Sequence, residues 1–174
     1  MNVLVFGKDG QLGKAFQALL GSLAVKSADA LCIQYVGRSE CDLADAAALS
    51  MLLYQFRPNL IINASAYTAV DKAETEADLA FAINAKAPEI MAQYAASHGA
   101  TFLHYSTDYD FDGEKYGYYL ENDMRHPLGV YGKSKAAGEE AIANAFANTS
   151  SDGQYVIFRT SWVYGEGGNF IRTI

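Results

Sequence analysis

The chain has 174 residues, of which 51% are hydrophobic and only 3 are proline, so it holds enough apolar material for one compact domain. Its net charge is -7, and no run of Lys or Arg supplies the basic face that a nucleic-acid-binding protein needs. No apolar stretch approaches the roughly 20 residues that span a bilayer, and the first apolar run lacks a basic leader. We therefore expect a cytoplasmic protein with no nucleic-acid or membrane partner. Cys32 and Cys41 have neither metal-binding nor redox spacing, and we expect reduced thiols.

Short apolar runs bounded by turn residues predict strands buried on both faces, at 3–6, 31–36, 60–63, 101–105 and 155–158. Apolar residues at helical spacing predict helices at 11–22, 44–56, 74–97 and 129–147. This alternation predicts right-handed crossovers and a doubly wound α/β fold, in which a parallel sheet carries helices on both faces. Ligands of such sheets bind beyond the carboxyl ends of the strands, so the residues after each run are the candidates for a site.

Two segments depart from this alternation. Residues 107–128 show no period, but their aromatic residues argue against disorder, and we expect a loop over a site. Near the end of the sequence, Asn169 fits the N-cap of a helix that stops within about one turn. We therefore expect a truncated chain, or one whose end is covered by a partner.

A glycine-rich turn follows the first predicted strand. In GKDGQLG, Gly7 would permit the tight turn, Gly10 would let the backbone approach a pyrophosphate, and Gly13 would let the helix pack on the sheet. The N-terminus of that helix offers free N–H groups to phosphates. Such a pattern alone is often only a turn, but a strand before it and a helix after it favour a dinucleotide site.

The next two strand ends offer further contacts. Arg38 follows the second strand, where an arginine can hold the 2′-phosphate of NADP, although a solvated surface arginine is an equal interpretation. Asp42 and Leu43 would meet the adenine edge or cap the next helix. After the third strand, the small residues Asn63, Ala64 and Ala66 would let a cofactor lie against the backbone or would simply fill a crowded turn. We favour NADP and keep NAD as the alternative.

The strongest chemical pattern is YGKSK, which places Tyr131 and Lys135 on one face of a predicted helix. A nearby ammonium would lower the pKa of a phenol below its ordinary value of about 10, and such a tyrosine can protonate a carbonyl oxygen. The spacing alone is common and often incidental. The fourth strand changes this weighting, because Ser106 and Thr107 at its end could hydrogen-bond a substrate carbonyl.

Together these residues resemble an extended short-chain dehydrogenase/reductase. The strings GKDGQLG, NASAYTAVDKAE, HYSTDYDF, VYGKSKAAGE and FRTSWVYG resemble the dTDP-4-dehydrorhamnose reductase family over the whole chain. The resemblance implies an NAD(P)-binding Rossmann domain over residues 1–174, without the C-terminal substrate region. It implies NADPH, or NADH, as cofactor, a nucleotide sugar as substrate, and reduction of the 4-keto group of dTDP-4-dehydro-L-rhamnose.

The resemblance also implies residue roles. Thr107, Tyr131 and Lys135 would form the catalytic triad, in which Tyr131 donates the proton and Lys135 lowers its pKa and binds the nicotinamide ribose. The cofactor would contact Gly7, Gly10, Gln11, Leu12, Gly13, Ala64, Ala66, Tyr67, Tyr131 and Lys135, besides Arg38, Asp42 and Leu43, and the sugar would lie near Tyr109 and Trp162.

The sequence departs from the family pattern at two positions. Asp110 stands where the family usually has an apolar residue, and Ala15 stands where some members have a glutamate linked to a magnesium-bridged dimer. We therefore expect no metal, and a homodimer is left open. One alternative is a non-catalytic, NADP-binding regulatory homologue, against which the intact triad argues. Another is a nucleotide-sugar epimerase or dehydratase, since dehydratases usually have an acid after the threonine, as Asp108 is here.

Overall fold

The structure, a computed structural model, describes residues 1–26, 31–147 and 149–165. Within these ranges the chain forms a five-stranded parallel sheet in the order β2-β1-β3-β4-β5. The strands are β1 (Asn2–Phe6), β2 (Cys32–Val36), β3 (Leu60–Asn63), β4 (Thr101–Thr107) and β5 (Gln154–Thr160). The chain moves outward from β1 to β2 and then returns past β1 to β3, so the carboxyl edge has a switch point between β1 and β3. The predicted doubly wound fold is confirmed.

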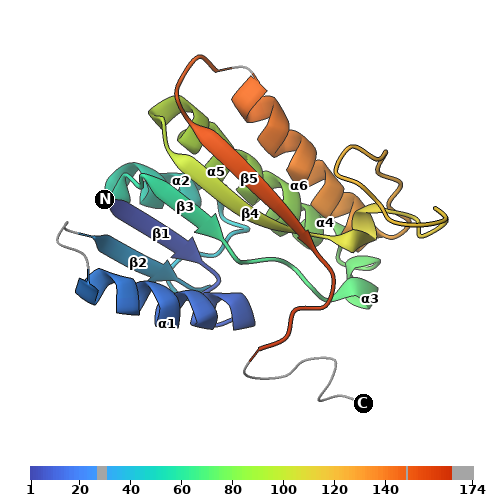
Figure 1. The fold of residues 1–174 in the computed structure, drawn as a ribbon, viewed down its shortest axis with the longest axis horizontal. Helices are drawn as coiled ribbons and strands as arrows, with labels where there is room; N and C mark the ends of the chain where they lie inside the picture. The colour runs from blue at the N-terminus through green and yellow to red at the C-terminus, as the bar shows by residue number, and fades with distance from the viewer. Residues whose placement is uncertain (27–30, 148, 166–174) are drawn as a thin grey trace.

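Helices cover both faces of the sheet (Figure 1). They are α1 (Gln11–Lys26), α2 (Ala46–Phe56), α3 (Val70–Ala73), α4 (Ala77–Phe81), the π-helical turn η1 (Ala82–Lys86), α5 (Ala87–His98), the 3₁₀ turn η2 (Asp108–Asp110) and α6 (Val130–Ala147). Side chains alternate along β1: Val3 and Val5 pack toward α1, whereas Leu4 and Phe6 join the larger core under α2, α5 and α6. This alternation gives the sheet two cores, one on each face.

The helix predicted over residues 74–97 is present but begins later, at Ala77, and contains a π-helical turn. The N–H groups of Thr75 and Glu76 both donate to the carbonyl of Lys72 and end α3 in a turn. The chain then re-enters a helix at Ala77, and the π-helical turn η1 separates α4 from α5. Apolar spacing does not reveal an extra residue in a turn, which is why the pattern suggested one continuous helix.

The prediction that every strand is buried on both faces is wrong for the sheet edges. β5 is an edge strand among the described residues, and Tyr155, Val156 and Phe158 are each 39–46% exposed. β2, the opposite edge, has one buried residue, Val36. Of the described helices, only α1 lies on its face of the sheet (Figure 1), where it packs over β1 and reaches β4 through Phe16 and Tyr105.

Two expectations from composition can be compared with the described residues. Cys32 and Cys41 are free thiols, as expected, with Cys41 buried and Cys32 exposed. In residues 1–26, 31–147 and 149–165, none of the helices combines the length and the apolar character needed to cross a bilayer. The helix expected to begin near Asn169 lies outside the described residues.

Candidate active site at the carboxyl edge of the sheet

A cavity of about 990 Å³ opens where β1 to β5 end, and α6 closes one side of it. Every predicted site residue except Gly13 and Asn63 lines this cavity. They are Gly7, Gly10, Gln11, Leu12, Arg38, Asp42, Leu43, Ala64, Ala66, Tyr67, Thr107, Tyr109, Tyr131, Lys135 and Trp162. The structure thus brings together residues that lie more than 150 positions apart in the sequence, and their individual roles stay predictions.

The glycine turn is built by close backbone contacts. Gly7 has a φ of +87°, and a Cβ there would lie 2.6 Å from the carbonyl oxygen of Ala64. A Cβ on Gly13 would lie 2.0 Å from the carbonyl oxygen of Gly7, so only glycine lets α1 approach β1 this closely. α1 has no acidic residue in its first turn, and its positive dipole end faces the cavity. This end of the cavity suits a phosphate group.

The end of β2 carries a set of exposed ion pairs. Arg38 Nε lies 3.2 Å from Asp42 Oδ2, and Lys8 Nζ lies 2.6 Å from Glu40 Oε1. Glu40 Oε2 also accepts from the Gly37 N–H at 2.8 Å. The hydrogen bonds from Lys8 and Gly37 lower the pKa of Glu40 to about 2. The two cations Lys8 and Arg38 therefore lie near this end of the cavity, and each is paired with a carboxylate that an anionic ligand would have to displace or share.

The two interpretations of Asp42 can now be compared. The N-cap of α2 is Asp45, whose side chain accepts from the N–H groups of Ala47 and Ala48. Asp42 instead accepts from the Ala44 N–H one turn earlier, at 3.0 Å, and pairs with Arg38. Asp42 therefore does not cap α2, and its side chain lines the cavity beside Leu43, where a ligand can reach it.

Behind β3, the buried side chain of Asn84 holds the cavity wall in place. Its Oδ1 accepts from the Tyr67 N–H at 2.8 Å, and its Nδ2 donates to the Tyr67 carbonyl and to Ser134 Oγ, both at 3.0 Å. Asn84 lies in the π-helical turn η1, a feature that often occurs at functional sites. Sequence reasoning missed it. The only clue was an asparagine inside an Ala-rich helical pattern, where its propensity is poor.

Tyr131 and Lys135 lie in the first turns of α6 and are both largely buried. Burial raises the pKa of Tyr131, although its hydrogen bond with Thr107 opposes the rise. Lys135 Nζ donates to the Tyr105 carbonyl at 2.6 Å and lies 3.3 Å from His104 Nε2. Burial lowers the pKa of Lys135 to about 8, although Asp110 and Glu139 oppose this. The expected lowering of the Tyr131 pKa is therefore wrong for the chain's own side chains, because burial and the nearby carboxyl groups of Asp110 and Asp108 both raise it.

Thr107 and Tyr109 fix the other side of the tyrosine. Thr107 Oγ1 accepts from the Tyr109 N–H at 3.2 Å and so caps η2. The Tyr109 ring packs edge-on against Tyr131, with ring centroids 5.5 Å apart. A Cβ on Gly132 would lie 2.3 Å from the Tyr109 carbonyl oxygen, so the backbone of η2 touches α6 directly. These contacts hold the Thr107 hydroxyl next to the Tyr131 phenol.

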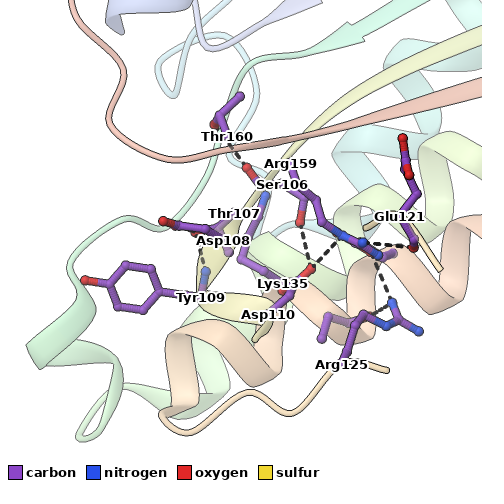
Figure 2. A network of polar contacts seen from close by, with 12 residues as sticks. Ser106, Thr107, Asp108, Tyr109, Asp110, Glu121, Arg125, Lys135, Arg159 and Thr160 are labelled. Carbon is purple, nitrogen blue, oxygen red and sulfur yellow. Dashed lines mark hydrogen bonds and ion pairs between the residues drawn. The ribbon is translucent and has the colours of Figure 1, made fainter. Parts of the chain in front are cut away.

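Beneath this pair lies a buried ion network (Figure 2). Arg159 of β5 lies 2.6 Å from Glu139 and 3.5 Å from Asp110, and Arg125 lies 3.2 Å from Glu139. Burial and the hydrogen bond with Glu139 raise the pKa of Asp110 to about 8. Burial would raise the pKa of Glu139, but the hydrogen bonds from Arg159, Asp110 and Ser106 lower it to about 2. Asp110, which stands where the family pattern led us to expect an apolar residue, is thus accommodated as a protonated partner of Glu139.

The predicted loop over the site is largely wrong. Of residues 107–128, only Thr107, Asp108 and Tyr109 line the cavity. The remainder turns away along α6, since Arg125 donates to the Ala136 carbonyl and Arg159 donates to the Glu121 carbonyl (Figure 2). Its aromatic residues Tyr116 and Tyr118 are almost fully exposed.

The remaining predictions concern the sugar and a metal. Trp162 lines the cavity with its side chain more than half exposed, and Tyr109 lines it half exposed; their contact with a sugar stays a prediction. Ala15 lies on an exposed part of α1. Among the residues that the structure describes, no three His, Cys, Asp or Glu side chains are grouped as a metal site.

Comparison with known families gives one decisive match. The model of the RmlD substrate binding domain matches residues 1–174, the whole chain. The chain belongs to this family. The dTDP-4-dehydrorhamnose reductase of Escherichia coli K12 is 43% identical over 176 residues, which cover 100% of this chain and 56% of that protein.

Solved structures of RmlD-type proteins have the same fold. The dTDP-4-dehydrorhamnose reductase of Clostridium acetobutylicum superposes with a TM-score of 0.86 at 36% identity, over 99% of this chain and 57% of that one. The reductase of Bacillus anthracis, solved in complex with NADP, gives a TM-score of 0.85 at 35% identity, with the same coverage. The chain therefore spans a little more than half the length of the relatives that it matches.

Proposed function

We propose that the chain is the cofactor-binding domain of an NADPH-dependent reductase that converts dTDP-4-dehydro-L-rhamnose to dTDP-L-rhamnose. The observation that carries this proposal is that one cavity joins the two sets of predicted residues. The glycine turn lines one end of this cavity, and Thr107, Tyr131 and Lys135 line the other. The named relatives support the substrate, since those cited above are dTDP-4-dehydrorhamnose reductases.

The residues present fit a dinucleotide. Gly7 and Gly13 leave room that a Cβ would fill, and the N-terminus of α1 faces the same cavity. Arg38 lies where a 2′-phosphate would arrive and favours NADPH over NADH, and the NADP complex of the Bacillus anthracis relative supports this choice. Ala64, Ala66 and Tyr67 would lie along the cofactor, and Tyr109 and Trp162 would contact the sugar.

The chain's own residues supply position and a proton. When bound, NADPH supplies the hydride that reduces the keto carbon. Thr107 orients the ketone oxygen by a hydrogen bond, and the Tyr131 phenol gives that oxygen its proton. Because burial raises the pKa of Tyr131, the phenol keeps its proton until the oxygen becomes negative. Two free thiols fit a reducing compartment, so we place the enzyme in the cytoplasm. A homodimer stays a prediction.

An assay of NADPH oxidation in the presence of dTDP-4-dehydrorhamnose tests the proposal. Tyr131→Phe should reduce turnover by about 10²- to 10⁴-fold, the usual contribution of a general acid, and weaken NADPH binding by no more than about fivefold, the effect of one lost hydrogen bond. Tyr118→Phe makes the same chemical change at an exposed position and should have no effect. Conversion of a nucleotide sugar without net NADPH consumption would instead identify an epimerase or dehydratase. If a protein as long as the relatives cited above binds NADPH but shows no turnover, that result would favour the regulatory homologue.

A further inference from the structure

A chain of three buried polar side chains runs beneath the cavity. Asn63 ends β3, His104 lies on β4, and Lys135 lies on α6, and none of the three is more than 1% exposed. Asn63 Nδ2 lies 3.1 Å from His104 Nδ1, and His104 Nε2 lies 3.3 Å from Lys135 Nζ. Buried polar groups need partners, so the protons on this chain can be assigned by counting donors and acceptors.

The first assignment is the amide of Asn63. Its Oδ1 accepts from the Ser65 N–H at 3.1 Å, which leaves its NH₂ group to donate to His104 Nδ1. Turning the amide over would place the NH₂ group against the Ser65 N–H and leave that donor without an acceptor. Nδ1 of His104 is therefore an acceptor.

The second assignment is the imidazole of His104. Burial and the nearby Lys135 hold the pKa of His104 well below its ordinary value, so the ring is neutral and carries one proton. Since Nδ1 accepts, that proton is on Nε2, and it points at Lys135 Nζ. An ammonium group has no lone pair to accept it, whereas a neutral amine has one and still donates to the Tyr105 carbonyl.

We propose that His104 is a positioning residue for Lys135, and that its Nε2–H, aimed by Asn63, favours the neutral amine of Lys135 over the ammonium. The relevance of this to a reductase rests on the proposed function, but the hydrogen-bond assignment does not. It makes Lys135 a group that changes its charge, rather than a fixed cation beside Tyr131.

The charges around Lys135 act in both directions. Glu139 of α6, and Asp110 of η2 once it is ionised, favour the ammonium, while Arg159 of β5 pairs with both carboxyl groups and weakens their effect. Burial favours the neutral amine, and the donor count adds the His104 N–H to the same side. Burial, acting against the two carboxyl groups, lowers the pKa of Lys135 to about 8. As the pH rises through this value, Lys135 loses its charge and the Tyr131 phenol becomes a weaker acid.

The tautomer can be measured without any variant, substrate or cofactor. Long-range ¹H–¹⁵N NMR correlations of the 174-residue chain distinguish a protonated Nε2 from a protonated Nδ1. We expect His104 as the neutral Nε2–H tautomer at pH 9, above the pKa of Lys135. A protonated Nδ1 would overturn the proposal, and because no turnover is involved, that result would leave the proposed function intact.

A ¹³Cε titration of Lys135 measures the effect on the lysine. We expect a midpoint near 8 in the unaltered chain and a rise of about one pH unit in His104→Leu, which removes the N–H donor. Phe102→Leu changes a neighbouring buried residue on the same face of β4 and should leave the midpoint in place. An unchanged midpoint in a folded His104→Leu protein would contradict the proposal. If that variant does not fold, the tautomer measurement still decides.

Discussion

The two ends of the cavity are built in different ways. The glycine-turn end depends on backbone contacts between β1, α1 and β3, and the side chains near it form exposed pairs such as Lys8–Glu40 and Arg38–Asp42. The tyrosine end depends on buried side chains from β3, η1, β4, η2 and α6. A phosphate needs N–H groups and a positive potential, which a backbone supplies, whereas a proton donor needs a controlled pKa, which only neighbouring side chains and burial supply.

This difference predicts that the two ends fail differently. Substitutions at the glycine turn should abolish cofactor binding through steric contact with backbone. Those around Tyr131 should alter stability, pH dependence and turnover, because they disturb desolvated hydrogen bonds.

The largest effect is expected from Gly13→Ala. Its Cβ would lie 2.0 Å from the Gly7 carbonyl oxygen and 2.6 Å from the Gly7 carbonyl carbon, both backbone atoms, so α1 must move away from the turn. NADPH affinity measured by calorimetry should fall at least about 100-fold, since a misplaced helix N-terminus loses its phosphate contacts. Gly21→Ala is the matched control in the same helix. Nothing lies within 4 Å of its Cβ, so affinity should hold and stability should rise by about 0.5–1 kcal/mol.

Asn84→Ala tests the buried hydrogen bonds of the opposite end. The change removes three hydrogen bonds and leaves the Tyr67 N–H without its acceptor, so the free energy of unfolding should fall by about 3 kcal/mol. Urea denaturation measures this. The exposed Asn122→Ala should stay within about 0.5 kcal/mol of the unaltered chain. Equal effects of the two changes would show that η1 does not hold the cavity wall.

Asp110→Asn tests the shared proton of the ion network. The pKa of Asp110 is raised to about 8 in the folded chain, whereas an unfolded aspartate has a pKa of about 4. The folded state therefore holds more protons between these values, and stability is present at low pH and lost as the pH rises toward 8. The asparagine variant should lose this decline, which we expect to be on the order of 2 kcal/mol.

Thermal unfolding between pH 5 and pH 9 measures that slope. Exposed Asp152→Asn is the control and should keep the slope of the unaltered chain. Stability falls again in strong acid, where Glu139 is protonated as the pH approaches about 2, and neither substitution should remove this fall. A slope that survives Asp110→Asn would mean that another group carries it.

The smallest effect is expected from Glu40→Gln. The amide oxygen can still accept from the Gly37 N–H, but Lys8 loses its carboxylate partner and becomes available to a 2′-phosphate. NADPH affinity should rise about two- to fivefold, NADH affinity should not change, and the gain should shrink at high salt because the pair is exposed. Glu114→Gln, on the distant loop, should leave both affinities as they are. A parallel rise for NADH would remove the 2′-phosphate from the explanation.

The sequence predicted well those features that depend on local patterns. Each of these patterns spans only a few residues: the apolar strand runs, the glycine turn, and Tyr131 with Lys135. In the structure, residues from all three line one cavity. Features that depend on contacts across the fold were missed. In the sequence, nothing distinguishes His104 from an ordinary strand residue, because its partners Asn63 and Lys135 come from two other elements of the fold. Asp110 looked like a departure from a pattern until Glu139 and Arg159 appeared beside it.

The loop after β4 shows the same limit. Its aromatic residues suggested a cover for the site, but Arg125 and Arg159 hold it along α6 and β5, and no local pattern reveals those distant partners.

The central claim is that the carboxyl edge of this sheet is an NADPH site whose binding and proton-donating ends are separable. Calorimetric titration of the 174-residue chain with NADPH, in its unaltered and Tyr131→Phe forms, tests it most directly. We expect their NADPH affinities to agree within about fivefold, the effect of one hydrogen bond, and to exceed those for NADH, since we propose that Tyr131 acts mainly on the substrate oxygen and Arg38 on the 2′-phosphate. No binding by a chain shown to be folded, or tighter binding of NADH, would contradict the account.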